Sequence, residues 1–153
     1  MSENNLVIEP VSPEDINEIE SLVRRTSEQD IFPLFSDEGR NTFSHSIAQD
    51  TRTIFDSHRF YTVKAMEENR IIGVAALRDK NYMTTLFVDK SYQNKGVGKG
   101  LLNHVLEHSE GESVSLRASI NAISFYQHQG FEATGPEGNV KGVRFLPMTY
   151  IKD

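Results

Sequence analysis

The chain has 153 residues, a formal net charge of −6 and no cysteine, so it can bury one substantial core but has no disulfide, thiolate metal site or cysteine nucleophile. Its acidity argues against nonspecific nucleic-acid binding, which needs a basic face. Because no apolar run approaches the ~20 residues that span a membrane and the first residues lack a secretory-signal pattern, we expect one cytoplasmic domain over residues 1–153.

The N-terminal third predicts an edge strand, a capped helix and a less regular segment. Residues 6–10 form the strand, which we place at a sheet edge because Pro10 cannot donate to a neighbouring strand. Ser12 is typical of a helix N-cap before Pro13 at the first helical position, and apolar residues then recur at helical spacing. Residues 27–58 are broken by proline and glycine and predict only a second, short helical region.

The rest of the chain alternates strands and helices around a central hairpin. The predicted elements are strands at 60–67, 71–77 and 82–88, a helix ending near residue 111, a strand at 114–118, a helix at 122–129, and strands at 131–134 and 143–151. This mixture, with a hairpin in the middle, indicates an α/β (α+β) fold with a partly antiparallel sheet.

The most informative segment is the glycine-rich turn between the third of these strands and the helix after it. Backbone N–H groups at a helix start lack intrahelical partners and attract anions, and Gly96, Gly98 and Gly100 let a ligand approach the backbone. A P-loop requires Ser or Thr after Lys99, where this chain has Gly100, and the dinucleotide fingerprint requires glycine where it has Leu101. Both nucleotide motifs therefore fail, although the turn still predicts a phosphate-bearing ligand.

What remains is the spacing Gln93-x-x-Gly96-x-Gly98 after an apolar strand, followed in the chain by a second motif. That motif, A-x-x-F/L-Y-x-x-x-G-F, is matched by Ala122, Phe125, Tyr126, Gly130 and Phe131. Together the two motifs resemble those of the GNAT superfamily of acyl-CoA-dependent N-acyltransferases, and the resemblance covers residues 6 to about 150. It implies a single GNAT-like domain with a twisted six- to seven-stranded sheet flanked by about four helices.

The resemblance also implies transfer of an acetyl group from acetyl-CoA to a primary amine, by direct attack in a ternary complex and without a metal. Backbone groups of the strand before the turn would polarise the thioester carbonyl. Tyr126 is the expected general acid, because a phenol with a pKa near ~10 is protonated at neutral pH and can donate to a departing thiolate. Ser119 and Asn121 either contact the cofactor or cap the following helix. The expected cofactor-binding residues are Leu86, Phe87, Val88, Gln93, Asn94, Lys95, Gly96, Val97, Gly98, Lys99, Gly100, Ser119, Asn121 and Tyr126.

The general base, the acceptor and the oligomeric state are left open. The strand of residues 82–88 carries no carboxylate, and the base is sought among Glu67, Asp79, Glu28, Asp30, Asp37, Glu38 or a chain of waters. A small polyamine, an antibiotic, an amino acid and a protein amine are all compatible acceptors. A homodimer through the C-terminal strand is a further hypothesis, with contacts at Arg144, Phe145, Pro147 and Met148.

Two other functions compete with acetyl transfer. The missing strand carboxylate keeps open a non-catalytic acyl-CoA-binding sensor on the same fold. His104 and His108, with Glu107 between them, match the H-x-x-E-H motif of inverted zinc peptidases and suggest a zinc hydrolase. Because both histidines lie opposite the apolar stripe of their helix, we expect them to face solvent and to bind no metal.

Overall fold

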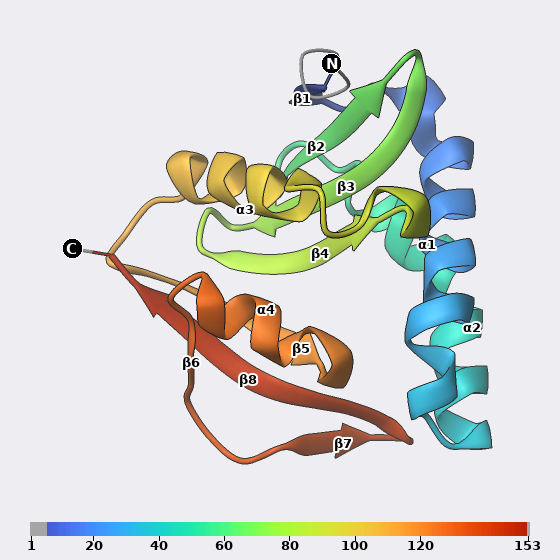
Figure 1. The fold of residues 1–153 in the computed structure, drawn as a ribbon, viewed down its shortest axis with the longest axis vertical. Helices are drawn as coiled ribbons and strands as arrows, with labels where there is room; N and C mark the ends of the chain where they lie inside the picture. The colour runs from blue at the N-terminus through green and yellow to red at the C-terminus, as the bar shows by residue number, and fades with distance from the viewer. Residues whose placement is uncertain (1–5, 153) are drawn as a thin grey trace.

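A computed structural model describes residues 6–152, which form an eight-stranded mixed sheet with flanking helices (Figure 1). The strands are β1 (Val7–Pro10), β2 (Phe60–Glu67), β3 (Arg70–Arg78), β4 (Tyr82–Val88), β5 (Ser113–Ser119), β6 (Glu132–Ala133), β7 (Gly138–Val140) and β8 (Val143–Ile151). They lie in the order β1-β2-β3-β4-β5-β8-β6, and β7 also pairs with β8. The helices are α1 (Ile16–Asp30), α2 (Asp37–Thr53), α3 (Val97–His108) and α4 (Ile123–His128).

Strand β3 forms the centre of the core and is covered on both faces. Ile72 and Ala75 pack in a cluster that includes residues of α3, whereas Ile71 and Val74 pack in a cluster that includes residues of α1 and α2. All four side chains are at most 3% exposed. A strand that is buried on both faces has apolar residues at successive positions, which explains the continuous apolar run in β3.

The parallel pair β4 and β5 is joined only at one end. Tyr82 pairs with Ser115 and Met83 with Leu116, and no later residue of β4 pairs with β5. From there β4 stays paired with β3, while β5 pairs along its length with β8. The two halves of the sheet therefore spread apart beyond Met83, and the helix pair α1 and α2 spans the opening side (Figure 1).

The predicted second helical region is confirmed, but its expected short length is wrong, because α2 runs for 17 residues. Its N-cap is Ser36, whose Oγ accepts a hydrogen bond from the Gly39 N–H at 3.1 Å. Gly39 does not break the helix but lies in its first turn, where a Cβ would overlap the Gly142 carbonyl. The glycine is thus required for close packing of α2 on the β7–β8 turn.

Other differences from the sequence-based prediction are small. The bounds of β4 and β8 are confirmed, whereas the helix expected to end near residue 111 ends at His108. The sheet has eight strands rather than six or seven, because the short strand β7 was not expected, whereas β6 falls within the strand predicted at 131–134. Met148 is fully buried, so it cannot take part in the expected dimer contact. Within residues 6–152, no helix is long and apolar enough to cross a membrane.

Candidate active site

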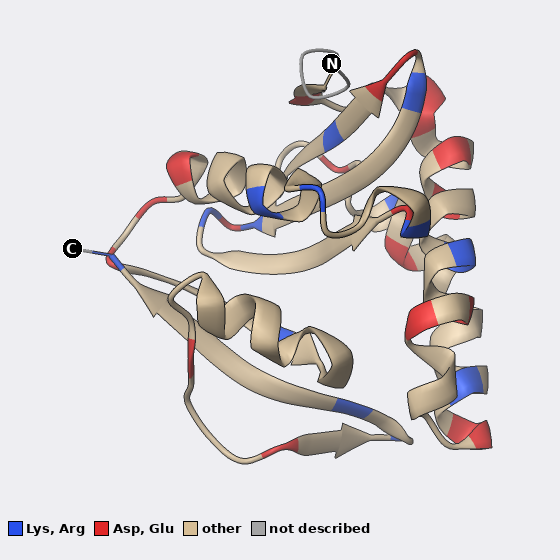
Figure 2. Cartoon of the chain, in the orientation of Figure 1, with Lys and Arg blue, Asp and Glu red and all other residues tan. Residues whose placement is uncertain are grey.

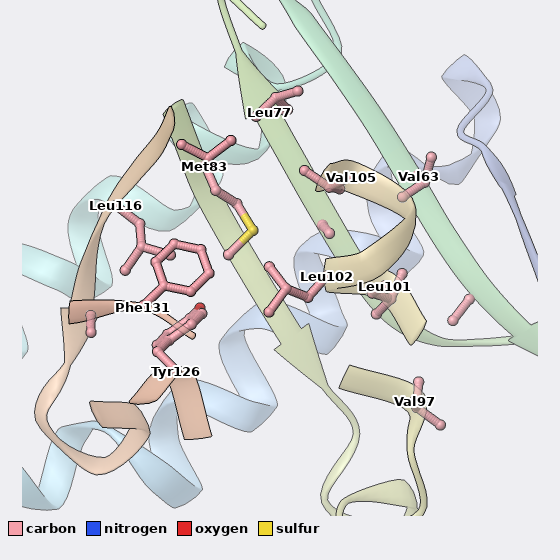
Figure 3. Close-up of a cluster of buried hydrophobic side chains, with 14 of the residues drawn as sticks. Val63, Leu77, Met83, Val97, Leu101, Leu102, Val105, Leu116, Tyr126 and Phe131 are labelled. Atoms are coloured by element: carbon pink, nitrogen blue, oxygen red, sulfur yellow. The ribbon is translucent and has the colours of Figure 1, made fainter. Parts of the chain in front are cut away.

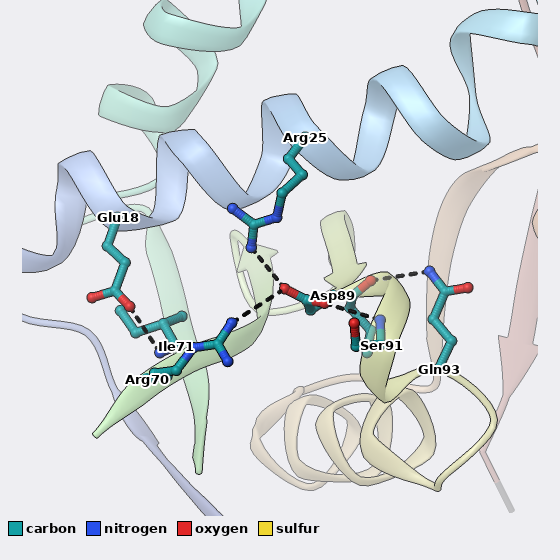
Figure 4. A network of polar contacts seen from close by, with 8 residues as sticks. Glu18, Arg25, Arg70, Ile71, Asp89, Ser91 and Gln93 are labelled. Atoms are coloured by element: carbon teal, nitrogen blue, oxygen red, sulfur yellow. Dashed lines mark hydrogen bonds and ion pairs between the residues drawn. The ribbon is translucent and has the colours of Figure 1, made fainter. Parts of the chain in front are cut away.

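Asp89 anchors the turn that follows β4 (Figure 4). Its Oδ2 accepts a hydrogen bond from Arg25 at 2.7 Å and lies 3.9 Å from Arg70, and its Oδ1 accepts the Ser91 N–H at 2.9 Å. Burial by itself raises the pKa of this carboxyl, but the Ser91 N–H and the two guanidinium groups outweigh burial and hold the pKa of Asp89 below its ordinary value. The ionised carboxylate therefore fixes the place where the turn leaves the sheet.

Gln93 ties the same turn to its neighbours. Its Nε2 donates to Asp30 Oδ2 at 2.8 Å and to the Val88 carbonyl at 3.0 Å. Asp30 also pairs with Lys90 at 2.8 Å. The glutamine thus links α1 to the end of β4 and gives the glycine-rich backbone a defined path.

The backbone of residues 94–99 presents unused donors. Asn94 and Gly96 have φ values of 64° and 86°, and Gly96 is the N-cap of α3. In the part of the chain that the structure describes, none of the N–H groups of residues 94–99 donates to another protein group, whereas the Gly100 N–H donates to the Gly96 carbonyl at 2.9 Å. Bare N–H groups at a helix start suit a phosphate, so residues 94–99 fit the expected ligand and the amide of Gly100 does not.

A cavity of about 430 Å³, here called the cofactor cavity, lies beside this turn. Its walls come from α1, the end of β4, the glycine-rich turn and the segment that leads into α4. The Thr26 hydroxyl is buried on this wall without a hydrogen-bond partner among the described residues. Bare amides and an orphaned hydroxyl beside apolar side chains fit the phosphates and the amide-containing arm of a coenzyme A.

A second cavity of about 400 Å³, here called the acceptor cavity, lies between the sheet and α2. Its walls come from α1, α2, the end of β3, β4 and β5. The two cavities share five lining residues, namely Ile31, Leu86, Phe87, Ser119 and Tyr126. The two cavities therefore adjoin where β4 has left β5.

Tyr126 stands at this meeting point. Figure 3 shows its ring beside Phe131, between the strands that carry Met83 and Leu116. The ring packs edge-on against Phe125 and Phe131, with centroids 5.2 and 5.5 Å apart, and is 7% exposed. Burial raises the pKa of the phenol, so it is protonated at neutral pH. No described residue hydrogen-bonds the hydroxyl, and Tyr126 lines both cavities.

Residues Leu86, Phe87 and Val88 lie along one edge of the opening. On the β3 side their partners are Ala75, Val74 and Gly73. On the β5 side they have no strand partner, because β5 has already diverged. Their side chains are half-buried, so the same residues can pack in the core and present backbone groups to a ligand.

Most of the residues predicted to bind the cofactor line the cofactor cavity, and three do not. Lys95 lies over the Tyr92 ring at 5.7 Å, Val97 is 4% exposed in the core, and Gly100 faces Ile8. The remaining predicted residues lie on the cavity wall, and these are Leu86, Phe87, Val88, Gln93, Asn94, Gly96, Gly98, Lys99, Ser119, Asn121 and Tyr126.

Ser119 and Asn121 do not cap α4. Ser119 precedes a short 3₁₀ turn, Ile120–Ala122, and makes no side-chain cap hydrogen bond there, and the N-cap of α4 is Ala122. Both polar side chains are left for the cavity, which removes the capping alternative.

The contribution of α1 to the cofactor cavity was not predicted from the sequence. Thr26, Asp30 and Ile31 line it. A signal was present, since Thr26 and Asp30 continue the helical stripe of Ile19, Leu22 and Val23 at spacings of three and four residues.

Within the described part of the chain, Asp30 is the one candidate base that lines either cavity, and it lies on the wall of the cofactor cavity. Its carboxylate pairs with Lys90 and accepts a hydrogen bond from Gln93. Asp79 is bound to Arg59 at 2.8 Å, and Asp37 is paired with Arg40. Three glutamates line neither cavity, and these are Glu28, Glu38 and Glu67.

Among the described residues, the carboxylate that lines the acceptor cavity is that of Asp50 on α2, which was not among the bases expected from the sequence. Asp50 as a whole is exposed, yet desolvation of its carboxyl raises the pKa above the ordinary value. The Ser46 hydroxyl offsets part of this rise. Its position follows from helical spacing, because Asp50 lies three residues after Ile47 and four before Ile54, which are both buried.

The expectation that His104 faces solvent is wrong. Its Nε2 lies 2.8 Å from the Tyr61 hydroxyl, and its ring stacks with those of Tyr61 and His108, with centroids 5.9 and 4.9 Å away. Desolvation and the neighbouring His108 lower the pKa of His104. Over residues 6–152, no group of three or more His, Cys, Asp or Glu side chains could hold a metal ion.

Comparison with known proteins gives matches to one family. A family model of the acetyltransferase (GNAT) domain matches residues 31–152. GCN5-related N-acetyltransferase 2, a chloroplastic protein of Arabidopsis thaliana, is 37% identical over 89 residues, which cover 53% of this chain and 33% of that protein. The match thus spans about a third of that relative's own length.

Solved structures share the fold over nearly the whole chain. A GCN5-related N-acetyltransferase from Rhodopseudomonas palustris superposes with a TM-score of 0.84 at 21% identity, covering 95% of this chain and 94% of that one. The PaiA N-acetyltransferase of Thermoplasma acidophilum, solved in complex with coenzyme A, gives 0.75 at 18% identity, covering 95% and 98%.

Proposed function

The chain belongs to the GNAT family of acetyltransferases, and on that premise we propose that it transfers an acetyl group from acetyl-CoA to a primary amine by direct attack in a ternary complex. The observation that carries this proposal is the meeting of two cavities where β4 leaves β5. One cavity offers bare amides beside a helix start, and the other opens toward α2.

The cofactor cavity suits acetyl-CoA, which supplies an activated thioester when bound. The N–H groups of residues 94–99 would hold its phosphates. The Thr26 hydroxyl and the unpaired edge of β4 would bind the pantetheine arm. Backbone N–H groups of Leu86 to Val88 on the side away from β3 are fixed dipoles that can polarise a carbonyl without reorganisation.

Tyr126 is proposed as the proton donor to the sulfur atom. Because burial keeps the phenol protonated, it is in the form that a departing thiolate requires. The chain contains no cysteine, so the proposal needs no covalent acyl-cysteine. A cytoplasmic location belongs to the same proposal and rests on composition.

The test compares Tyr126→Phe with the matched control Tyr150→Phe, since Tyr150 also packs against Phe131 but lines neither cavity. We expect Tyr126→Phe to lower kcat by roughly 10²-fold with nearly unchanged acetyl-CoA affinity, because only proton donation is lost. Tyr150→Phe should keep kcat within about threefold.

Two outcomes would contradict this account. An unchanged kcat in Tyr126→Phe would remove Tyr126 from the mechanism. Wild-type protein that binds acetyl-CoA but acetylates no amine in a broad panel would instead support the acyl-CoA-binding sensor.

A further inference from the structure

We propose that the acceptor is a small amine that also carries an anionic group, with Asp50 receiving its ammonium and Arg78 and Arg117 receiving its anion. This inference rests on the proposed function, because it names the substrate class of the same site. The three residues come from α2, β3 and β5 and line one cavity. Figure 2 shows that β4 carries no charged residue, so the charge on these walls comes from the other elements.

Arg117 stands at the start of the divergence between the two strands. It follows Leu116, the last residue of β5 that pairs with β4. Its guanidinium lies 4.5 Å over the Phe145 ring, and it forms no ion pair with any residue in the range 6–152. A planar guanidinium held on an aromatic ring with open donors is suited to a carboxylate or phosphate.

Arg78 provides a second set of unused donors. Its guanidinium lies 4.7 Å over the Tyr82 ring, and its Nε is buried with no hydrogen-bond partner among the described residues. The neighbouring Asp79 does not satisfy it, because that carboxylate is 3.7 Å away and accepts from Arg59 at 2.8 Å. A buried donor without a partner is rare in folded proteins and points to a missing acceptor.

Asp50 supplies the opposite charge. It is the one carboxylate on the described walls of the acceptor cavity, and no Lys or Arg of the described chain pairs with it. Desolvation beside apolar neighbours disfavours its charged form. An ammonium group placed beside it would compensate that cost.

The balance of charge selects against purely cationic acceptors. The cavity wall carries two guanidinium groups and one carboxylate, although the whole chain has a net charge of −6. A polyamine would offer ammonium groups to both arginines and no anion to either, which costs affinity through like-charge contact. The cavity volume of about 400 Å³ also falls in the range of small-molecule sites.

With these groups, every bond and proton in the acetyl-transfer step can be accounted for. The acceptor ammonium gives one proton to the Asp50 carboxylate, which passes it to solvent. The free amine nitrogen then forms a bond to the thioester carbon, the carbon–sulfur bond breaks, and its electron pair leaves on sulfur. Tyr126 protonates the sulfur, and the second proton lost from nitrogen restores the phenol, so one proton is released in total.

The test uses pairs of amines that differ in one charge. Apolar α-amino acids such as leucine and phenylalanine, and ω-amino acids from β-alanine to 6-aminohexanoate, are each compared with their own carboxamides, with cadaverine and spermidine added. Acetyl transfer is followed by thiol release and product mass. Binding of each amine to the CoA-saturated protein is measured beside it by calorimetry.

We expect at least one amino acid to be acetylated with a kcat/KM about tenfold or more above that of its carboxamide. Arg117→Gln and Arg78→Gln should each remove most of this ratio and leave acetyl-CoA affinity unchanged. Arg52→Gln is the matched control, because the side chain of this exposed arginine on α2 hydrogen-bonds Gln49 of its own helix and no other residue in the range 6–152.

Each outcome separates this inference from the proposed function. Acetylation of polyamines or carboxamides in preference to every amino acid would overturn the inference while leaving acetyl transfer intact. Preferential binding of amino acids without turnover would uphold the inference and overturn the transferase. If no amino acid is preferred over its carboxamide, in binding or in turnover, the inference is overturned.

Discussion

The cofactor cavity and the acceptor cavity are similar in size but differ in how the chain builds them. The cofactor cavity is formed largely by two short segments, residues 86–99 and 119–126, with a contribution from α1. The acceptor cavity draws on α1, α2, β3, β4 and β5, with its charged residues at positions 50, 78 and 117. In the proposed function, one ligand would be held mainly by local backbone geometry, and the other by side chains that only the fold brings together.

The difference explains what the sequence could and could not predict. Backbone recognition requires glycine at particular places, so the spacing of Gly96 and Gly98 could be recognised. Asp50 lies in a segment where Pro33 and Gly39 obscure the helical pattern, and its role depends on where α2 packs. Most residues that line the cofactor cavity were therefore named from the sequence, whereas the charged residues that line the acceptor cavity were not.

Particular elements of the fold show the same limit. The bounds of β4 could be predicted because Asn81 and Asp89 flank it, and the start of β8 could be predicted because Gly142 precedes it. The divergence of β4 from β5 came only from the family resemblance, since strand periodicity carries no information on neighbours. The position of His104 was mispredicted because its helix stripe does not reveal Tyr61 on β2.

The largest effect is expected for Gly39→Ala, which should alter the acceptor cavity and leave the cofactor cavity unchanged. A Cβ at this position would overlap the Gly142 carbonyl, so Gly39→Ala must shift α2. We expect a loss of about 2 kcal/mol of unfolding free energy, measured by denaturant titration. At temperatures where the variant is folded, the KM of the amine should rise while acetyl-CoA affinity stays the same.

Gly135→Ala is the control for that substitution, because a Cβ there meets Pro147 at 3.6 Å, an ordinary contact. Equal stability of both variants and wild type would show that α2 is not held by this contact. A loss of acetyl-CoA affinity in Gly39→Ala would contradict the separation of the two cavities.

An intermediate effect is expected at Asp50. Asp50→Asn should lower kcat/KM for the amine by about tenfold, because the ammonium loses its charged partner, and leave acetyl-CoA binding unchanged. The carboxylate form is the active one, so wild-type activity should fall as the pH drops through the raised pKa of Asp50, and this acid limb should be absent in the variant.

Glu38→Gln, an exposed change on the same helix that lines neither cavity, should behave as wild type in both assays. An identical pH profile in Asp50→Asn and wild type would exclude Asp50 from proton transfer.

The smallest effect is expected on the cofactor side, at Asp89. Asp89→Asn keeps an acceptor for the Ser91 N–H but loses the charge that pairs with Arg25, and should cost about 1 kcal/mol at neutral pH. Because the folded pKa of Asp89 is depressed, its stabilisation is present above the ordinary carboxyl value of 3.8 and is lost as the pH falls through the folded pKa.

The stability difference between wild type and Asp89→Asn should therefore shrink on acidification below about pH 4. Acetyl-CoA affinity should weaken a few-fold, with amine affinity unchanged. A pH-independent difference, or a change in amine affinity alone, would contradict the role given to Asp89.

The binding of acetyl-CoA to the glycine-rich turn is tested most directly by calorimetric titration of acetyl-CoA into wild type, Gly98→Glu and Asn103→Glu. Position 98 lies on the wall of the cofactor cavity, and a Cβ there meets only contacts of 3.6 Å or longer, whereas Asn103 is an exposed residue of the same helix that lines neither cavity. The account predicts micromolar binding to wild type and Asn103→Glu and a loss of about 100-fold or more in Gly98→Glu, because a carboxylate would replace the phosphate. Folded wild-type protein that does not bind acetyl-CoA, or equal binding by Gly98→Glu, would contradict it.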